Sequence, residues 1–388
     1  MLILGLNAYH PDAAACVLRD GRLLAAVEEE RFRRAKHWAG LPIQAVKYCL
    51  DEAGATLADV DHLAVNRRPG AASLRRLAYL LSHRPAFGLI WERLRRACGT
   101  HSIVGELRGA MGGQDFHAQF HPVEHHLAHL ASAFMVSDFQ KAVCVSMDGF
   151  GDFASAAWGL GHGQDIVIDG RIFFPHSLGI FYSAITQYLG FPGFGDEYKV
   201  MGLAAYGQPR FLSQMRQLVS IQPHGGFLLN LRFFCHHTRN VNFGWDGGVP
   251  RIGCMWTPEL EQLLGPARRP GAPLRTEHQD IACSAQAMYE ETLFLFLRRL
   301  HQKYRCANLA LSGGCALNSV ANGKITSNSP FQRVYVPAAA GDAGGAVGAA
   351  LLVWQQVKGD GRGADGRERS AVRPCQSGQA CFGPEFSN

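Results

Sequence analysis

The sequence predicts an α/β fold made of two copies of one unit, and three observations support that prediction. Strand-like segments recur in the same order about 140 residues apart, beginning at Leu2 and again at Ala142. Glycine-rich turns follow two later apolar segments, as at the strand-to-helix turns of α/β proteins. The chain has 388 residues and is 47% hydrophobic, so it can bury one large core or two smaller ones.

The first copy occupies the N-terminal part of the chain. Its apolar pattern predicts a helix that begins at Pro42 and runs to Ala53, then a strand at His62–Asn66. Before this helix, the Asp20-Gly21 pair is a hairpin-turn signal between two strands. The strands that precede the helix are expected at Leu2–Asn7, Ala13–Leu18 and Arg22–Glu28.

The second copy repeats this order. A helix is predicted from Ile180 to Tyr188, after strands at Ala142–Met147, Ala154–Gly159 and Asp165–Phe173. Duplicated units of this kind are typical of the actin-like ATPase superfamily, in which two ribonuclease-H-like halves enclose a nucleotide. Similar element orders occur in other α/β folds.

Two glycine-rich turns add to this pattern. Ser312-Gly313-Gly314 follows a short strand at Asn308–Leu311, and a helix is expected to start near Ala316. Gly341-Asp342-Ala343-Gly344-Gly345 follows a strand at 334–336 and precedes a small-residue helix at 346–354. Glycines at such turns let backbone N–H groups approach phosphate oxygens. Tight packing is the alternative explanation for each turn.

A histidine pair predicts a metal site. His125 and His129 are four residues apart, so on a helix they would point from one face. Asp148 ends the following apolar strand, and Asp342 lies in the second glycine-rich turn. Two His and two Asp suit iron(II), manganese or zinc. His126 would face about 100° away on the helix and is expected to be a neighbour.

Composition narrows the remaining possibilities. The eleven cysteines are scattered without a C-x-x-C pair, which favours reduced thiols and a cytoplasmic location. Cys235-His236-His237 lacks a second ligand pair at zinc-finger spacing. The N-terminus predicts a strand instead of a signal peptide, and no apolar run approaches the ~20 residues of a membrane helix.

The net charge is +6, and much of the basic excess lies in one segment between Arg75 and Arg96. An amphipathic helical pair with a solvated basic face is the simpler interpretation of this segment. An anion-binding surface is the alternative; nucleic acid is disfavoured because no recognised binding motif is present. The basic residues concerned are Arg75, Arg76, Arg84, Arg93, Arg95 and Arg96.

Several longer motifs, in one order from Leu4 to about Leu352, resemble the O-carbamoyltransferase family. Its members include nodulation and antibiotic-tailoring carbamoyltransferases, with tRNA threonylcarbamoyltransferases as distant relatives. The motifs are Gly5-Leu6-Asn7-Ala8-Tyr9-His10, the segment from Ala25 to His37, the His125/His129 segment, Met147-Asp148-Gly149, Glu197-Tyr198-Lys199-Val200-Met201-Gly202-Leu203, Ser312-Gly313-Gly314-Cys315-Ala316-Leu317-Asn318 and Gly341-Asp342-Ala343-Gly344.

The resemblance implies a two-step reaction. A C-terminal YrdC-like domain makes carbamoyladenylate from carbamoyl phosphate and ATP. An N-terminal actin-like domain of the actin/Hsp70/sugar-kinase type then passes the carbamoyl group to a hydroxyl of a small molecule. That domain is expected at residues 1–355, with lobes at about 1–138 and 139–355.

The resemblance also assigns residues to roles. It implies that His125, His129, Asp148 and Asp342 hold a divalent metal, often iron. Further positions are grouped by expected role: Gly149, Gly313, Gly314 and Asn318 along the nucleotide; His10 and Asp12 as base candidates; Glu29, Arg31, Lys36 and Lys199 for substrate or interdomain contact. Relatives often place His directly before Asp in the first turn, whereas Pro11 separates them here.

Residues 356–388 are expected to be a flexible charged linker and the start of a truncated C-terminal domain. On that interpretation the chain would need carbamoyladenylate from a separate YrdC-like domain or a full-length homologue. The alternatives are a kinase-like or ATP-hydrolysing enzyme, an inactive or partner-dependent nucleotide-binding fragment, and a tRNA-modifying role permitted by the basic segment.

Overall fold

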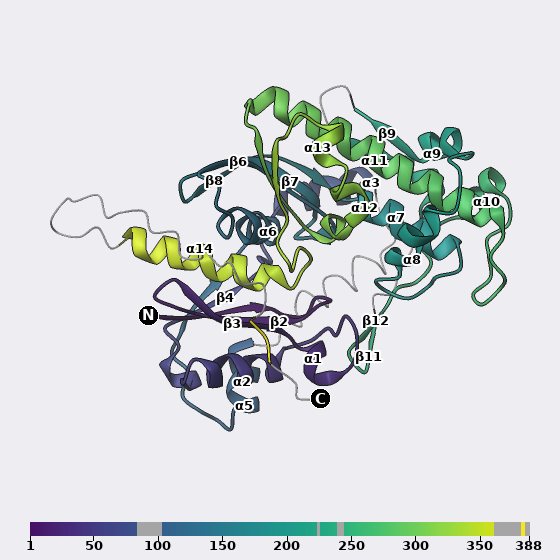
Figure 1. Ribbon diagram of the computed structural model, residues 1–388. Helices are drawn as coiled ribbons and strands as arrows, with labels where there is room; N and C mark the ends of the chain where they lie inside the picture. Colours follow the sequence, from purple (N-terminus) through teal and green to yellow (C-terminus); the bar gives the residue numbers. More distant parts are fainter. Residues whose placement is uncertain (84–102, 223–225, 239–243, 361–381, 385–388) are drawn as a thin grey trace.

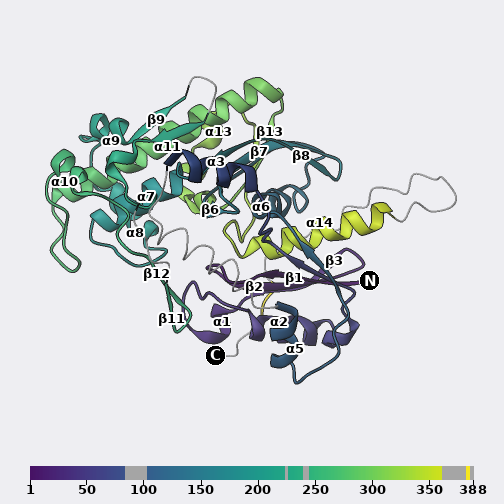
Figure 2. The same ribbon diagram turned by 180° about the vertical axis from the view of Figure 1, so that it is seen from behind.

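The computed structural model describes residues 1–83, 103–222, 226–238, 244–360 and 382–384. Two five-stranded mixed sheets dominate this part of the chain, and Figure 1 shows them one above the other with helices between and outside them. Figure 2 shows the same layers from behind. The N-terminus lies at an edge of the lower sheet.

The first sheet has the order β3-β2-β1-β4-β5. β1 pairs antiparallel with β2, which pairs antiparallel with β3, while β4 and β5 continue in parallel on the other side of β1. The strands are β1 (Leu2–Asn7), β2 (Ala14–Arg19), β3 (Arg22–Glu28), β4 (His62–Val65) and β5 (Gln119–Pro122).

The second sheet repeats this topology in the order β8-β7-β6-β13-β14. β6, β7 and β8 form the antiparallel part, and β13 and β14 add in parallel beside β6. The strands are β6 (Lys141–Gly151), β7 (Ala154–His162), β8 (Asp165–Phe173), β13 (Asn308–Ser312) and β14 (Arg333–Tyr335). The protein therefore has the duplicated ribonuclease-H-like fold that the sequence predicted.

Two helices between the sheets connect the halves. α6 (His125–Phe134) precedes the second sheet in the chain and packs on it, whereas α14 (Gly344–Asp360) follows the second sheet and packs on β1, β2 and β4 of the first. The helices also pack closely on each other, because a Cβ on Gly348 would lie 1.8 Å from the Ala128 carbonyl oxygen. The two sheets thus share one central core.

The remaining helices cover the outer faces. Below the first sheet lie α1, α2 and α5, and above the second lies the long α11. Their bounds are α1 (Glu30–Arg33), α2 (Ile43–Glu52), η1 (Leu57–Asp59), α3 (Ser73–His83), α5 (Ile103–Ala110), α7 (Leu178–Tyr188), α8 (Glu197–Ala204), α9 (Leu212–Leu218), α10 (Pro258–Leu264), α11 (Thr276–Tyr304), η2 (Leu231–Phe233), η3 (Gly314–Leu317), α12 (Ser319–Asn322) and α13 (Ile325–Asn328), with short strands β9 (Val219–Ile221), β10 (Phe227–Leu229), β11 (Gly244–Asp246) and β12 (Val249–Arg251).

Local pattern predicted most element positions well, with differences at several ends. Near Ala316, where a helix was expected, the chain forms the 3₁₀ turn η3 from Gly314 and then the four-residue helices α12 and α13. Gly313 has a φ of 89°, and the side chain of Asn318 caps the restarted helix by accepting from Ala321 N–H at 3.0 Å. The helix predicted to end at Trp354 continues to Asp360.

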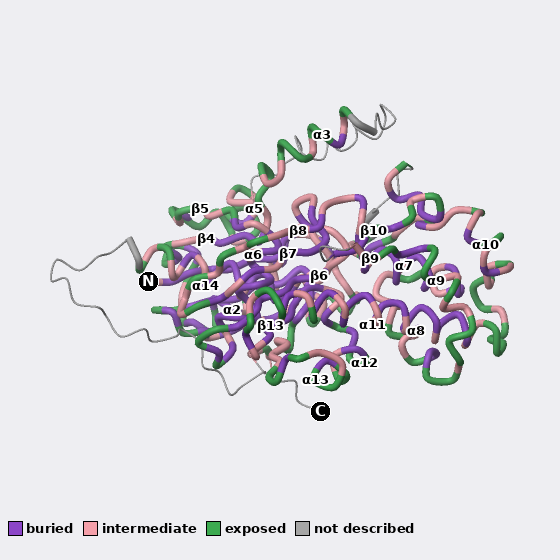
Figure 3. The backbone as a smooth tube through the Cα atoms, turned by 90° about the horizontal axis from the view of Figure 1, so that it is seen from above, coloured by how far each residue is buried: buried purple, intermediate pink, exposed green. Residues whose placement is uncertain are grey.

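The basic segment is only partly described. α3 lies at the periphery of the protein and carries mostly exposed or intermediate residues (Figure 3). Its arginines pack on aromatic rings of the second half: Arg75 lies 5.3 Å from the Phe173 ring centre, and Arg76 lies 5.7 Å from that of Phe153. The predicted second helix of this pair, with its four arginines, falls outside the described residues.

Of the predicted linker and domain start at 356–388, the structure describes 356–360, which belong to α14 and not to a flexible linker, and 382–384. There the Phe382 carbonyl accepts a hydrogen bond from Ala26 N–H at 3.1 Å, at the edge strand β3. The predicted linker and domain start otherwise lie outside the described residues. Within the described chain, no helix combines the length and apolar character needed to span a membrane.

Candidate metal centre

The four predicted metal ligands meet between the two sheets. His125 and His129 come from the buried face of α6, Asp148 from β6, and Asp342 from the loop before α14. The two His Nε2 atoms are 3.0 Å apart, and each lies 3.2–3.5 Å from Asp148 Oδ2 and Asp342 Oδ1. Segments 213 residues apart in the chain therefore converge on one point.

This arrangement fits a divalent metal. Five of the six distances between ligand atoms are 3.0–3.5 Å, and the two carboxylate oxygens lie within 4.8 Å of each other. A regular tetrahedron with edges of about 3.3 Å has its centre about 2.0 Å from each corner, the usual length of metal–imidazole and metal–carboxylate bonds. Two nitrogens and two oxygens are a suitable set for Fe²⁺, Mn²⁺ or Zn²⁺. One ion would satisfy both imidazole lone pairs and both carboxylates at once.

The pKa shifts of the cluster residues also indicate a site that favours positive charge. Burial alone would lower the pKa of His129, but hydrogen bonds with Asp148 and Asp342 raise it to about 9. Burial raises the pKa of Asp148, yet the two histidines hold it well below its usual value. Without a metal, a proton on His129 thus provides charge that a bound cation would supply.

Backbone groups hold Asp148 in place. Its Oδ1 accepts hydrogen bonds from the Gly149 N–H at 2.7 Å and the Gly314 N–H at 3.2 Å, which leaves Oδ2 facing the histidines. A Cβ on Gly314 would lie 2.7 Å from this carboxylate, and a Cβ on Gly151 would lie 1.9 Å from the His125 ring. Both glycines therefore make room for metal-ligand side chains.

The start of α6 is fixed by an acidic cap. Asp152 Oδ2 accepts hydrogen bonds from the backbone N–H of His125 at 2.9 Å and of Arg68 at 3.0 Å. A carboxylate at a helix N-terminus satisfies free N–H groups and interacts favourably with the helix dipole. Asp152 thus positions the first metal-binding histidine from the end of the strand that carries Asp148.

Both base candidates lie beside this cluster. His10 Nδ1 is 3.8 Å from Asp342 Oδ2, and the His10 ring stacks on that of His125 with centroids 5.4 Å apart. Asp12 faces the same loop, since a Cβ on Gly341 would lie 3.9 Å from its Oδ2. Burial raises the pKa of Asp12 above its usual value despite a hydrogen bond from His37, and Asp342 and Glu30 add to the increase.

The predicted nucleotide residues lie near the metal ligands, but their backbone donors are already engaged. The Gly313 N–H donates to the Ala340 carbonyl at 2.7 Å, while those of Gly149 and Gly314 donate to Asp148. Gly313 also packs against β6, where a Cβ would lie 2.1 Å from the Met147 carbonyl oxygen. The phosphate cradle expected from this turn is therefore not free in this state of the protein.

Asn318 belongs to a buried polar network. Its side chain exchanges hydrogen bonds of 3.0 Å with Gln286, whose Oε1 also accepts from the Tyr182 hydroxyl at 2.8 Å. Neighbouring Cys315 was expected to be a packing residue. Burial raises the pKa of its thiol well above the usual value, which opposes a nucleophilic role.

The four residues expected to contact substrate or another domain differ in how far they are exposed to solvent. Glu29 is fully buried, and its carboxylate accepts hydrogen bonds from Ala45 N–H at 2.8 Å and Arg33 Nε at 3.0 Å. It therefore caps α2 and is not available to a substrate, which corrects the expectation for this residue. Lys36 is exposed.

Arg31 and Lys199 remain accessible. Arg31 lies 3.7 Å from Glu28 and 3.8 Å from Glu30. Lys199 is paired with Asp196 at 2.6 Å, and this hydrogen bond raises its pKa. Both side chains keep further N–H donors beyond these pairs, so each could contact a ligand or another domain while retaining its acidic partner.

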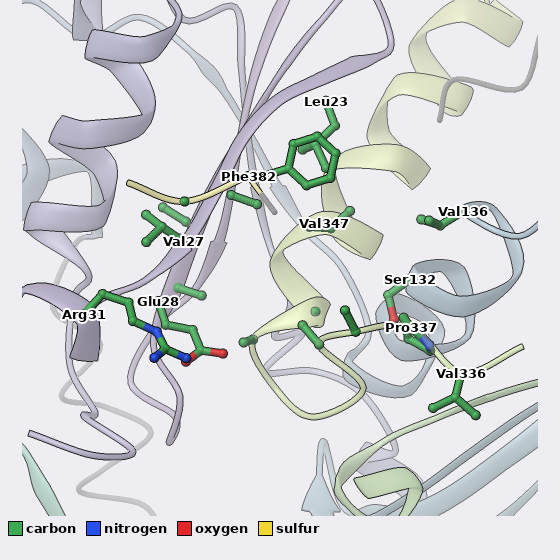
Figure 4. A pocket seen from close by; sticks show the side chains of 18 of the residues that line it. Leu23, Val27, Glu28, Arg31, Ser132, Val136, Val336, Pro337, Val347 and Phe382 are labelled. Atoms are coloured by element: carbon green, nitrogen blue, oxygen red, sulfur yellow. The ribbon is translucent and has the colours of Figure 1, made fainter. Parts of the chain in front are cut away.

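A cavity of about 840 Å³ lies against the loop at 336–343, which carries Asp342 and is called the metal-binding loop below. Figure 4 shows Leu23, Val27, Val347 and Phe382 on its apolar part, and Glu28 and Arg31 at a polar end, as labelled there. Burial raises the pKa of Glu28 to about 7, with Asp12 and Glu30 adding to the effect. Ala343 and Gly344 line both this cavity and the approach to Asp342.

The second possible metal motif has other partners. Cys235 Sγ lies 3.0 Å from the Cys254 carbonyl oxygen, and His236 Nε2 lies 2.7 Å from that of Pro175. Neither residue belongs to a ligand cluster within the described chain.

Comparison with known proteins identifies the family. Residues 2–351 match the family described as "Carbamoyltransferase N-terminus". An uncharacterised protein of Synechocystis is 36% identical over all of this chain, and nodulation protein NolNO of Sinorhizobium fredii is 35% identical over 90% of it. The chain belongs to the carbamoyltransferase family, as the resemblance indicated. It spans 61% and 47% of the lengths of these two relatives.

Solved structures with a similar arrangement share little sequence. HypF of T. kodakarensis matches 92% of this chain over 48% of its own, with a TM-score of 0.42 and 15% identity. A ROK hexokinase from Thermus thermophilus matches 92% of this chain and all of its own, with a TM-score of 0.43 and 14% identity.

Sequence reasoning gave no role to Asp152, the cap described above, or to two further residues that the structure places at the site. His37 lies within a quoted motif, and Asn7 ends the first predicted strand. His37 contacts Asp12, and Asn7 is fully buried beneath the same turn. A polar residue at the buried end of an otherwise apolar strand is a signal that could have identified Asn7.

Proposed function

We propose that this chain is the metal-binding transfer region of a carbamoyltransferase. It would pass a carbamoyl group from carbamoyladenylate to a hydroxyl of a small molecule such as a sugar or natural product. The observation that carries this proposal is the convergence of His125, His129, Asp148 and Asp342 beside His10. Membership of the carbamoyltransferase family supports the reaction class.

In the proposed transfer, the acceptor oxygen forms a bond to the carbamoyl carbon. The bond from that carbon to the phosphate oxygen breaks, and AMP leaves with its electron pair. The hydroxyl proton passes to a base within hydrogen-bond reach. His10 is the first candidate because it is partly exposed and adjoins Asp342. Asp12 is the second, because its raised pKa makes it a stronger base than an ordinary carboxylate.

The four-ligand cluster would hold a divalent ion, with Fe²⁺ the first candidate and Mn²⁺ or Zn²⁺ as alternatives. Such an ion supplies charge stabilisation to a phosphate leaving group and polarises a carbonyl oxygen. Backbone N–H groups orient the Asp148 carboxylate, and Asp152 caps the start of the helix that carries both histidines, so these supports hold the candidate ligands near one another.

Carbamoyl phosphate and ATP would be consumed elsewhere, by a YrdC-like domain or a full-length homologue that supplies the adenylate. The backbone N–H groups of Gly313 and Gly314 now donate to Ala340 and Asp148. They could contact the phosphate of the adenylate only after leaving these partners. Within this chain we propose two lobes that meet near residue 138, because all strands of one five-stranded sheet precede that position and all strands of the other follow it.

The test is a transfer assay on the purified chain loaded with Fe²⁺ or Mn²⁺ and given carbamoyladenylate and a panel of hydroxylated acceptors. Carbamoylated product and AMP are expected from wild type and not from His129→Ala. ADP formed from ATP and an acceptor would instead favour the kinase-like alternative. The proposal fails if wild type transfers nothing while a full-length relative does so under the same conditions.

A further inference from the structure

A histidine outside the metal cluster contacts the turn that carries both base candidates. His37 Nδ1 lies 2.7 Å from Asp12 Oδ1, and the His37 backbone N–H donates to Glu30 Oε2 at 2.7 Å. Asp12 and His37 both have a φ of 56°, in the left-handed region that non-glycine residues rarely adopt. The hydrogen bond therefore joins two residues whose backbone is locally strained.

A second side chain, that of Asn7, holds the backbone of the same turn by hydrogen bonds. Asn7 Nδ2 donates to the carbonyls of Pro11 and Asp12 at 2.9 Å each, and Asn7 is fully buried. Asn7 thus holds the backbone of the turn, while His37 holds the carboxylate of Asp12. Together these contacts direct the turn toward Gly341 and the metal-binding loop.

His37 also contacts the other half of the protein. Its ring meets the edge of Phe194 with centroids 5.2 Å apart, and a Cβ on Gly195 would lie 2.1 Å from its Nε2. These two residues belong to the loop between α7 and α8. Two residues after His37, the Ala39 N–H donates to the Gly248 carbonyl at 2.8 Å, which adds a second contact between the halves.

We propose that His37 is a positioning residue for the transfer reaction. It holds the His10–Asp12 turn against the metal-binding loop and joins that turn to the loop at 193–196 of the second half. This role rests on the proposed function because it concerns the same site. The base would therefore reach its working position only when the two halves are in contact.

The charge around His37 supports a strong contact. The hydrogen bond to Asp12 raises the pKa of His37 more than burial lowers it, and Glu30 and Glu197 also raise it. A charged imidazole makes a stronger hydrogen bond to a carboxylate than a neutral donor does. Asp12 and His37 are not among the four candidate metal ligands, so loss of their hydrogen bond should leave all four ligands in place.

The experiment compares His37→Asn with His37→Asp, together with His37→Ala. Asn and Asp have the same shape, and both tolerate a left-handed backbone. Only the Asn amide can donate to Asp12. The readouts are hydrogen–deuterium exchange of the segment at 8–13, Mn²⁺ affinity by calorimetry, and kcat and KM for transfer. His162→Ala, an exposed histidine at the end of β7, is the matched control.

We expect His37→Ala and His37→Asp to accelerate exchange at 8–13 and to lower kcat by about tenfold to a hundredfold, as small misplacements of reacting groups do. Mn²⁺ affinity and KM should stay near wild type. His37→Asn should restore slow exchange and most of kcat.

Unchanged exchange in His37→Ala would overturn the proposal, as would His37→Asp behaving like His37→Asn, or metal loss in all three variants. A wild-type protein that transfers nothing would contradict the proposed function instead. The exchange pattern, which needs no turnover, would then still decide whether His37 holds the turn.

Discussion

The two halves place equivalent turns at the site but stabilise them in different ways. After β1, the turn with His10 and Asp12 is held by two side chains, Asn7 and His37. At the end of β6, Asp148 is held by backbone N–H groups. Since a side-chain substitution removes the first kind of support and not the second, replacing a supporting side chain should damage proton transfer more than metal binding.

The largest effect should come from the metal ligands themselves. His129→Ala removes a buried nitrogen that lies 3.3 Å from both Asp148 Oδ2 and Asp342 Oδ1. The loss of Mn²⁺ affinity, measured by calorimetry, should exceed the roughly 10–100-fold typical of outer-shell substitutions. His162→Ala, exposed on β7, should bind as wild type. Equal affinity in the two variants would show that the cluster is not a metal site.

The second-largest effect is expected at one of two glycines in β6, which test whether close packing against His125 supports metal binding. Gly151→Ala would place a Cβ 1.9 Å from the His125 ring, whereas a Cβ on Gly149 meets nothing within 4 Å. Gly151→Ala should displace His125, lower Mn²⁺ affinity by about 10–100-fold and destabilise the fold by about 1–3 kcal/mol. Gly149→Ala should keep wild-type metal affinity. If the two variants bind metal equally well, His125 is not held by this contact.

A smaller, graded effect is expected from pH. In the metal-free protein, hydrogen bonds to the two aspartates raise the pKa of His129 to about 9 against the effect of burial. Metal must displace this proton at neutral pH, so affinity should rise by about tenfold per pH unit up to about pH 9 and then level off. Calorimetry in buffers of different ionisation enthalpy would detect the released proton. Affinity independent of pH between 7 and 9 would contradict this competition.

The smallest effect on the site should come from Glu29. Glu29→Ala leaves the Ala45 N–H at the start of α2 without an acceptor, which should cost about 1–3 kcal/mol of unfolding free energy. Glu29→Gln retains an oxygen acceptor and should lose less. Denaturant unfolding measures both variants, and their Mn²⁺ affinity should equal that of wild type. A change in transfer without a change in stability would restore a substrate role for this carboxylate.

Local pattern was sufficient for the strands because side-chain alternation and turn residues act over a few neighbours. The predicted bounds of β1, β3 and β8 agree with the structure at both ends. It was not sufficient at Gly313, where glycine is needed for packing against Met147 and the N–H is taken by Ala340. Both partners are far from Gly313 in sequence, so no local signal could indicate them.

The sequence by itself determined the duplicated α/β fold, the helix that carries the histidine pair and the residue types suited to a divalent metal. Only the tertiary structure decided that α6 and α14 each pack on the other half's sheet, which brings Asp342 to His129. It also decided that Glu29 caps a helix while His37 joins Asp12 to the second half. The reason is that local periodicity sets which face of an element is buried, whereas the partner of that face depends on contacts between distant segments.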